Sequence, residues 1–207
     1  MLAAFTAGLL LITISELGDK TFFIGVILAM RYSQKIVFTG VIAALAAMTV
    51  LSVMLGQVVS LLPEKYIHFG EISLFLGFGL KLIYDASQMP VTSECMAAKE
   101  ASVTVANADG TEKISLSPHL AILSQAFIMT FLAEWGDRTQ ISTIALAASY
   151  QPLGVTIGAI LGHSICTAIA VIGGKLIAGK ISERVVTAIG GVLFLIFGAV
   201  AIAEGIS

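Results

Sequence analysis

Long, continuous apolar segments dominate this chain and decide what it can fold into. A helix that crosses a bilayer needs about 20 mostly apolar residues. Six segments meet this requirement, at about 3–30, 36–62, 68–84, 119–148, 153–178 and 184–204. Only 12% of the 207 residues are charged, roughly half the share found in a soluble domain. So few charges cannot cover a water-facing surface, which argues against a soluble enzyme, a nucleic-acid-binding protein or a disordered chain. The composition predicts an all-α integral membrane protein with six transmembrane helices in a lipid bilayer.

A polar segment from Asp85 to Pro118 separates the third apolar segment from the fourth. A polar stretch between strongly apolar ones is typical of a loop or of a boundary between structural units. We therefore expect an N-terminal three-helix unit at 1–84, a linker loop at 85–118 and a C-terminal three-helix unit at 119–207.

The basic residues predict an orientation, because cytoplasmic connections carry an excess of Lys and Arg. If the N-terminus is outside, the cytoplasmic side holds Arg31, Lys35, Lys81, Lys99, Lys113, Lys175, Lys180 and Arg184. The outer connections then hold only Lys65. We expect both termini in the periplasm or lumen and the linker loop in the cytoplasm. The first residues lack the basic start and cleavage site of a signal peptide, so we interpret them as the first span of a mature or bacterial-type protein.

An offset of 118 residues relates the two halves of the chain. It matches Glu16, Gly18, Asp19, Lys20 and Thr21 to Glu134, Gly136, Asp137, Arg138 and Thr139. Each half has three expected spans, and because three is odd, the second half enters the membrane from the opposite side. The sequence therefore predicts an inverted-topology repeat, a plan that secondary transporters use to build a site near the bilayer midplane between the halves.

Acidic residues stand in the middle of the first and fourth apolar segments. A charge at that depth costs at least about 2.5–3.5 kcal/mol and is a functional-site candidate by default. On a helix, Glu16 and Asp19 share one face, as do Glu134 and Asp137. We expect these four carboxylates to converge and bind a metal ion. Together with Lys20 and Arg138 their formal charge is −2, which one divalent cation or two protons would neutralise. Oxygen ligands favour Ca²⁺, Mn²⁺ or Mg²⁺ and disfavour Cu(I).

Polar neighbours of these acids are candidates for supporting or gating roles, namely Ser15, Lys20, Thr21, Thr49, Arg138, Thr139, His163 and Thr167. Ser15, Thr21 and Thr139 could add hydroxyl ligands, while Gly18 and Gly136 allow either close helix approach or a local break. Thr49 and Thr167 could line the site or satisfy backbone carbonyls. His163 has no equivalent in the first half, where Leu45 stands. It could relay protons, add a ligand for Mn²⁺ or simply pack through a hydrogen bond. A structural ion-pair network is the alternative for the charged cluster as a whole.

The duplicated motif E-x-G-D-K/R-T/S, here Glu16–Thr21 and Glu134–Thr139, resembles that of the Golgi and thylakoid manganese and calcium transporter family. This family is a cation/proton antiporter-like group, and the resemblance extends over essentially the whole chain, with cyanobacterial manganese exporters as similar members. It implies export of Mn²⁺, and in some members Ca²⁺, from the cytoplasm in exchange for protons. It also implies that the motif acids bind the ion. We expect a plasma or thylakoid membrane protein for which the metal is substrate, with no permanently bound cofactor.

Three alternatives remain beside manganese export. The first is a Ca²⁺/H⁺ antiporter for which Mn²⁺ is a secondary substrate. The second is a passive divalent cation channel built on a charged ring, although an inverted repeat favours alternating access. The third is an intramembrane aspartyl protease, suggested by Asp19 and Asp137, each of which follows a glycine. Protease chemistry needs one aspartate dyad, whereas this chain repeats a Glu/Asp pair beside a basic residue, so we do not expect an enzyme.

Overall fold

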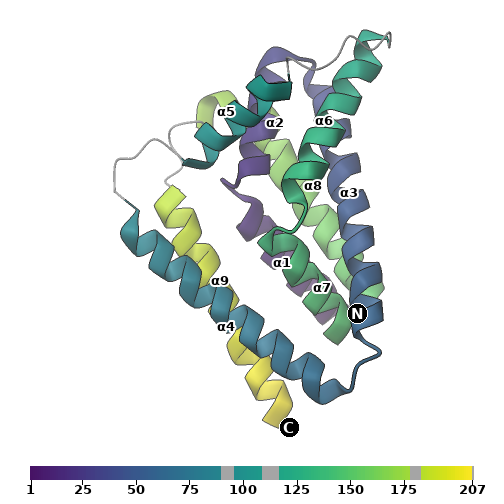
Figure 1. The fold of residues 1–207 in the computed structure, drawn as a ribbon, viewed down its shortest axis with the longest axis vertical. Helices are drawn as coiled ribbons and strands as arrows, with labels where there is room; N and C mark the ends of the chain where they lie inside the picture. Colours follow the sequence, from purple (N-terminus) through teal and green to yellow (C-terminus); the bar gives the residue numbers. More distant parts are fainter. Residues whose placement is uncertain (90–95, 109–116, 178–182, 207) are drawn as a thin grey trace.

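The computed structural model describes residues 1–89, 96–108, 117–177 and 183–206, and this part of the chain is helical apart from short connections (Figure 1). The helices are α1 (Leu2–Glu16), α2 (Lys20–Arg31), α3 (Gln34–Val59), α4 (Glu64–Gln88), α5 (Met96–Ala108), α6 (Pro118–Glu134), α7 (Arg138–Ser149), α8 (Pro152–Ile177) and α9 (Glu183–Ile206). The prediction of an all-α protein is therefore confirmed for the described residues.

Apolar helices of membrane-spanning length account for much of the described chain. Four single helices are long and apolar enough to cross a bilayer, namely α3, α4, α8 over Pro152–Gly173 and α9 over Arg184–Glu204. The pair formed by α1 and α2 meets the same criterion as one span bent by 65°. The described residues thus contain four or five candidate spans, and the chain is an integral membrane protein. The expected spans at 3–30 and 119–148 each consist of two helices, α1 and α2 in the first and α6 and α7 in the second.

A tight turn at a glycine separates α1 from α2. Leu17 has φ −63° and ψ 114°, and Gly18 follows with φ +78°. The backbone N–H of Asp19 donates to the carbonyl of Glu16 over 3.2 Å. These features define a type II β-turn, whose third residue needs a positive φ and is therefore usually glycine. Of the two roles expected for this glycine, close helix approach or a local break, the structure shows the break.

The second motif makes the same turn between α6 and α7. Trp135 has φ −65° and ψ 113°, Gly136 has φ +80°, and the N–H of Asp137 donates to the carbonyl of Glu134 over 3.1 Å. The sequence repeat is therefore also a repeat of backbone conformation at the charged motif.

Helices of one half pack mainly on helices of the other half. α1 lies along α8, while α3 lies along α6 and α7. Two glycines 118 residues apart make the close approaches possible. A Cβ at Gly40 on α3 would lie 2.8 Å from the Cβ of Ala126 on α6, and one at Gly158 on α8 would overlap the backbone of Phe5 on α1. Larger residues at either position would push the two halves apart.

The helices α4 and α9 form a separate antiparallel pair that lies at an angle to the others (Figure 1). The Phe75 ring on α4 packs against Phe194 on α9, with ring centroids 5.9 Å apart. The contact is reciprocal, since Gly79 faces Leu195 and Gly198 faces Leu76. This pair also contacts α7 and α1, so it leans on one side of the broken helices.

The expected linker loop contains a helix, which corrects the expectation of a plain loop at 85–118. α4 continues to Gln88, and α5 packs on α2 through Ala101 and Val105, both fully buried. Their spacing of four residues places them on one face of the helix. The remaining parts of the linker, 90–95 and 109–116, lie outside the described residues, as do Lys113 and Lys180, which the orientation argument used.

Candidate functional site

The two breaks bring the acidic side chains of both motifs together. Glu16 and Glu134 are the last residues of α1 and α6, while Asp19 and Asp137 precede the first turns of α2 and α7. Carboxylate oxygens of Glu16, Asp19 and Glu134 all lie within 4.8 Å of one another, and the Asp137 carboxyl lies beside that of Asp19. The N-termini of α2 and α7 and the C-termini of α1 and α6 meet at this cluster, so their opposite partial charges act against each other.

Each glutamate keeps one carboxylate oxygen free for a ligand. Thr21 Oγ1 donates to Glu16 Oε2 over 2.9 Å, and Thr139 Oγ1 donates to Glu134 Oε2 over 3.0 Å. The Oε1 atoms of both glutamates are buried and have no hydrogen-bond partner. A buried acceptor left unsatisfied costs about 1–3 kcal/mol, and more when it is charged. Two such atoms stand at equivalent places in the two motifs, where they could hold a cation or protons.

The two basic residues of the motifs differ in what they contact. Arg138 Nη2 lies 3.5 Å from Asp19 Oδ1, and its Nε lies 3.8 Å from Asp137 Oδ1. Lys20 instead lines a surface cavity beside α5, together with Glu100. Of these two basic residues, Arg138 is the one that lies within ion-pair distance of the motif acids in the described part of the chain. The four carboxylates and Arg138 alone carry a formal charge of −4 + 1, or −3.

Two small cavities of about 10 Å³ flank the glutamates, each the size of one water or ion. Glu16, Thr21 and Thr167 line the first, and Glu134, Thr139 and Thr49 line the second. Thr49 Oγ1 also donates to the carbonyl of Leu45 over 2.8 Å, so it both lines a cavity and satisfies its own helix. The imidazole of His163 lines both cavities.

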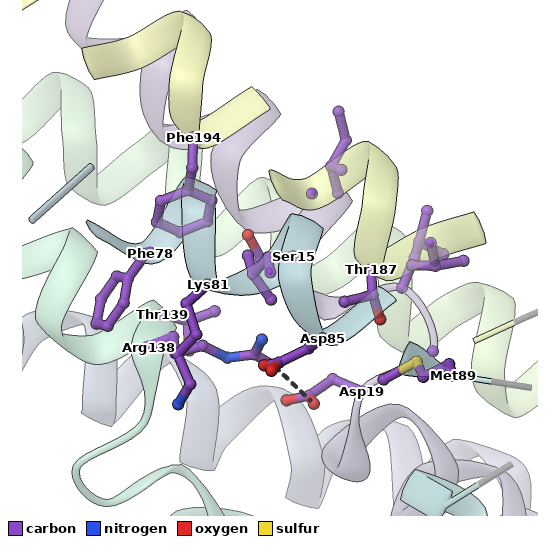
Figure 2. Close-up of a pocket in the computed structure, with 16 residues that line it drawn as sticks. Ser15, Asp19, Phe78, Lys81, Asp85, Met89, Arg138, Thr139, Thr187 and Phe194 are labelled. Carbon is purple, nitrogen blue, oxygen red and sulfur yellow. Dashed lines mark hydrogen bonds and ion pairs between the residues drawn. The ribbon is translucent and has the colours of Figure 1, made fainter. Parts of the chain in front are cut away.

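A larger cavity of about 290 Å³ reaches the motif from the end of α4 that leads to the linker. Ser15, Asp19 and Arg138 line its inner part, and Ser15 Oγ is buried without a hydrogen-bond partner. Lys81 and Asp85 line it from α4. Figure 2 shows the Arg138 guanidinium joined to Asp19 by a dashed line, with Asp85 among the other residues that line the cavity. The cavity thus contains one further acid, Asp85, besides Asp19, and it extends from the site to the linker end of α4.

Polar contacts join α4 and α9 to α7 at the opposite end. Ser149 Oγ donates to Glu71 Oε2 over 2.6 Å, and the Tyr150 hydroxyl donates to Glu204 Oε2 over 2.8 Å. Glu71 is only 5% exposed. Burial, together with the hydrogen bond to Glu204, raises the pKa of Tyr150 above its usual range, so its hydroxyl remains a donor. The sequence reasoning missed these residues. An acid inside the apolar segment 68–84 was the signal that could have found Glu71.

Comparisons with known proteins identify the family of this chain. The family model described as divalent cation/proton antiporter GDT1 matches residues 4–90 and 122–207. The GDT1-like protein sll0615 of Synechocystis is 55% identical, over 97% of both chains. GDT1-like protein 3 of rice is 45% identical over 94% of this chain and 71% of its own length. The chloroplastic PAM71 homologue of Arabidopsis thaliana is 40% identical over 95% of this chain and 58% of its own length. No solved structure matches. The chain therefore belongs to the GDT1 family of divalent cation/proton antiporters.

Proposed function

We propose that this protein exports Mn²⁺ from the cytoplasm in exchange for protons, with Ca²⁺ as a second substrate, by alternating access. The observation that carries the proposal is the meeting of carboxylates from both halves around the two partnerless glutamate oxygens. Carboxylate and hydroxyl oxygens suit Mn²⁺ and Ca²⁺. Glu16, Asp19, Glu134 and Asp137 are the proposed ligands, and Thr21 and Thr139 orient the two glutamates.

The proposed topology has six spans in two inverted repeats, at 1–84 and 119–207, joined by the segment 85–118. In it, α6 and α7 cross the bilayer as one broken span, as α1 and α2 do. The matching turns at Gly18 and Gly136 support this arrangement. The packing of α1 on α8, and of α3 on α6 and α7, also supports it, because each contact joins one half to the other. The two chain ends lie toward one end of the molecule and α5 toward the other (Figure 1). This agrees with outer or lumenal termini and a cytoplasmic linker, in a bacterial-type plasma membrane or a thylakoid membrane.

Alternating access explains why the two ends of the molecule differ. The larger cavity reaches Asp19 from the linker end, while the Glu71 and Glu204 contacts hold α4 and α9 against α7 at the other end. With the linker in the cytoplasm, this arrangement is the inward-facing state that loads the ion. One end open and one end packed is what an antiporter needs, whereas a passive channel needs a path through both.

The repeat also suggests how the outward-facing state is built. Leu74, Phe75 and Leu76 on α4 recur 119 residues later as Leu193, Phe194 and Leu195 on α9. The same spacing matches Asp85 to Glu204, and the offset of 118 residues matches Tyr32 to Tyr150. Asp85 lines the open cavity. In the proposed outward-facing state, the pair α4 and α9 tilts so that Asp85 meets Tyr32 and the linker end closes.

Flux measurements in proteoliposomes test this function. The protein should move Mn²⁺ and Ca²⁺ while a trapped pH indicator records protons moving the other way, with Mg²⁺ and Zn²⁺ as comparison ions. The variants Glu16→Gln and Asp137→Asn should lose transport yet elute as folded protein in size-exclusion chromatography. Glu100→Gln, an exposed acid on α5, is the matched control and should transport normally. Normal transport by the motif variants, or flux without proton counterflow, would contradict the proposal.

A further inference from the structure

His163 is a buried histidine that lies beside the carboxylate cluster and faces Glu16. It lies on α8, is 5% exposed, and its Nδ1 has no hydrogen-bond partner. The nearest acidic atom in the described part of the chain is Glu16 Oε1, at 3.9 Å, which also lacks a hydrogen-bond partner. This distance is too long for a hydrogen bond. Two buried polar atoms that face each other across such a gap can both bind an ion placed between them.

The repeat shows that the fold itself does not require an imidazole here. Leu45 on α3 is the equivalent residue 118 positions earlier, and like His163 it lines both small cavities beside the glutamates. An apolar side chain of similar size therefore fills the same place in the other half. A histidine that only filled space at this depth would bury a polar ring without need, at a cost of about 1–3 kcal/mol for each unsatisfied group.

We propose that His163 is a specificity-determining residue whose Nδ1 ligates the transported ion next to Glu16 and favours Mn²⁺ over Ca²⁺. The proposal rests on the proposed function and deepens it. Ca²⁺ binds oxygen ligands almost exclusively, whereas first-row transition metals also accept imidazole nitrogen. The motif oxygens serve both ions, so they do not separate them. One added nitrogen strengthens the site for Mn²⁺, and for Zn²⁺ still more according to the usual order of affinities, without strengthening it for Ca²⁺.

Two variants test the selectivity in proteoliposomes. His163→Leu installs the residue that the other repeat carries, and His163→Gln keeps a polar side chain without a ring nitrogen. Both should lower the ratio of Mn²⁺ to Ca²⁺ transport by about tenfold, the lower end of the loss seen when a group supporting a metal site is removed. Zn²⁺ binding should fall with that of Mn²⁺. Cys166→Ser is the matched control, because Cys166 lines the same cavity but its thiol donates to the Thr13 carbonyl. It should leave the ratio unchanged.

A spectroscopic measurement decides the same question without transport. Electron spin echo modulation of Mn²⁺ bound to the purified wild-type chain should show coupling to a ¹⁴N nucleus. This coupling should disappear in His163→Gln and persist in Cys166→Ser. Its absence in the wild type, or an unchanged Mn²⁺ to Ca²⁺ ratio in both His163 variants, overturns the assignment while export itself still stands. A wild-type protein that carries neither ion instead removes the proposed function and this inference with it.

Discussion

The hydrogen bond between Ser149 and Glu71 makes a quantitative prediction about the closed end. Ser149→Ala removes the donor that lies 2.6 Å from the Glu71 carboxylate, while Glu71 stays buried on α4. Leaving a buried acceptor unsatisfied costs about 1–3 kcal/mol. At 1.4 kcal/mol for each factor of ten, the ratio of open to closed molecules at this end should rise by about 5- to 150-fold.

Distances between spin labels measure this ratio directly. Tyr66 near the start of α4 and Leu153 near the start of α8 are 68% and 54% exposed, so labels on cysteines placed there disturb little packing. The native Cys95 and Cys166 are first replaced by serine. Pulsed electron spin resonance should then show a second, longer distance in Ser149→Ala. The ratio of molecules with the longer distance to molecules with the shorter distance should rise by the predicted factor.

The matched control is Ser87→Ala on α4, the helix that carries Glu71. Its hydroxyl donates over 2.6 Å to the carbonyl of Tyr84 in its own helix, so its loss should leave the distance distribution unchanged. If Ser149→Ala gives the same distribution as the parent protein, the contact does not hold α4 against α7. The explanation of the closed end by this contact would then be wrong.

Further predictions concern the motif itself. Gly136→Ala should destabilise the protein by about 1–2 kcal/mol, the cost of a positive φ for a residue with a Cβ, since that Cβ would meet no atom within 4 Å. A lower unfolding temperature in detergent checks this, and Gly70→Ala, which also has open space, should show no such loss. Arg138→Gln should impair Mn²⁺ transport because it leaves Asp19 and Asp137 without their cation. Lys20→Gln should leave Mn²⁺ transport unchanged, because Lys20 lines a cavity beside α5. Equal effects of the two substitutions would refute the claim that only Arg138 compensates the aspartates.

Much of this protein could be predicted from local sequence. Runs of apolar residues predict helices in a membrane without any knowledge of their neighbours, because each helix satisfies its own backbone hydrogen bonds in lipid. The duplicated charged motif predicts both the family and a meeting of acids from the two halves, since isolated charges at that depth are too costly. The glycines in the motif left two readings open, and only the backbone angles at Gly18 and Gly136 decide that each helix breaks there.

The tertiary structure decided what the repeat leaves ambiguous. Lys20 and Arg138 are equivalent in sequence, yet Arg138 reaches the aspartates and Lys20 faces α5. The two ends of the molecule carry related residues, yet in the described part of the chain the hydrogen bonds that join α4 and α9 to the end of α7 lie at one end, at Glu71 and Glu204. A sequence repeat specifies equivalent local conformations, but α4 and α9 can lean on only one side of the broken helices at a time. The side on which α4 and α9 pack depends on contacts between residues far apart in the chain, such as Ser149 with Glu71. Local sequence patterns do not specify such contacts.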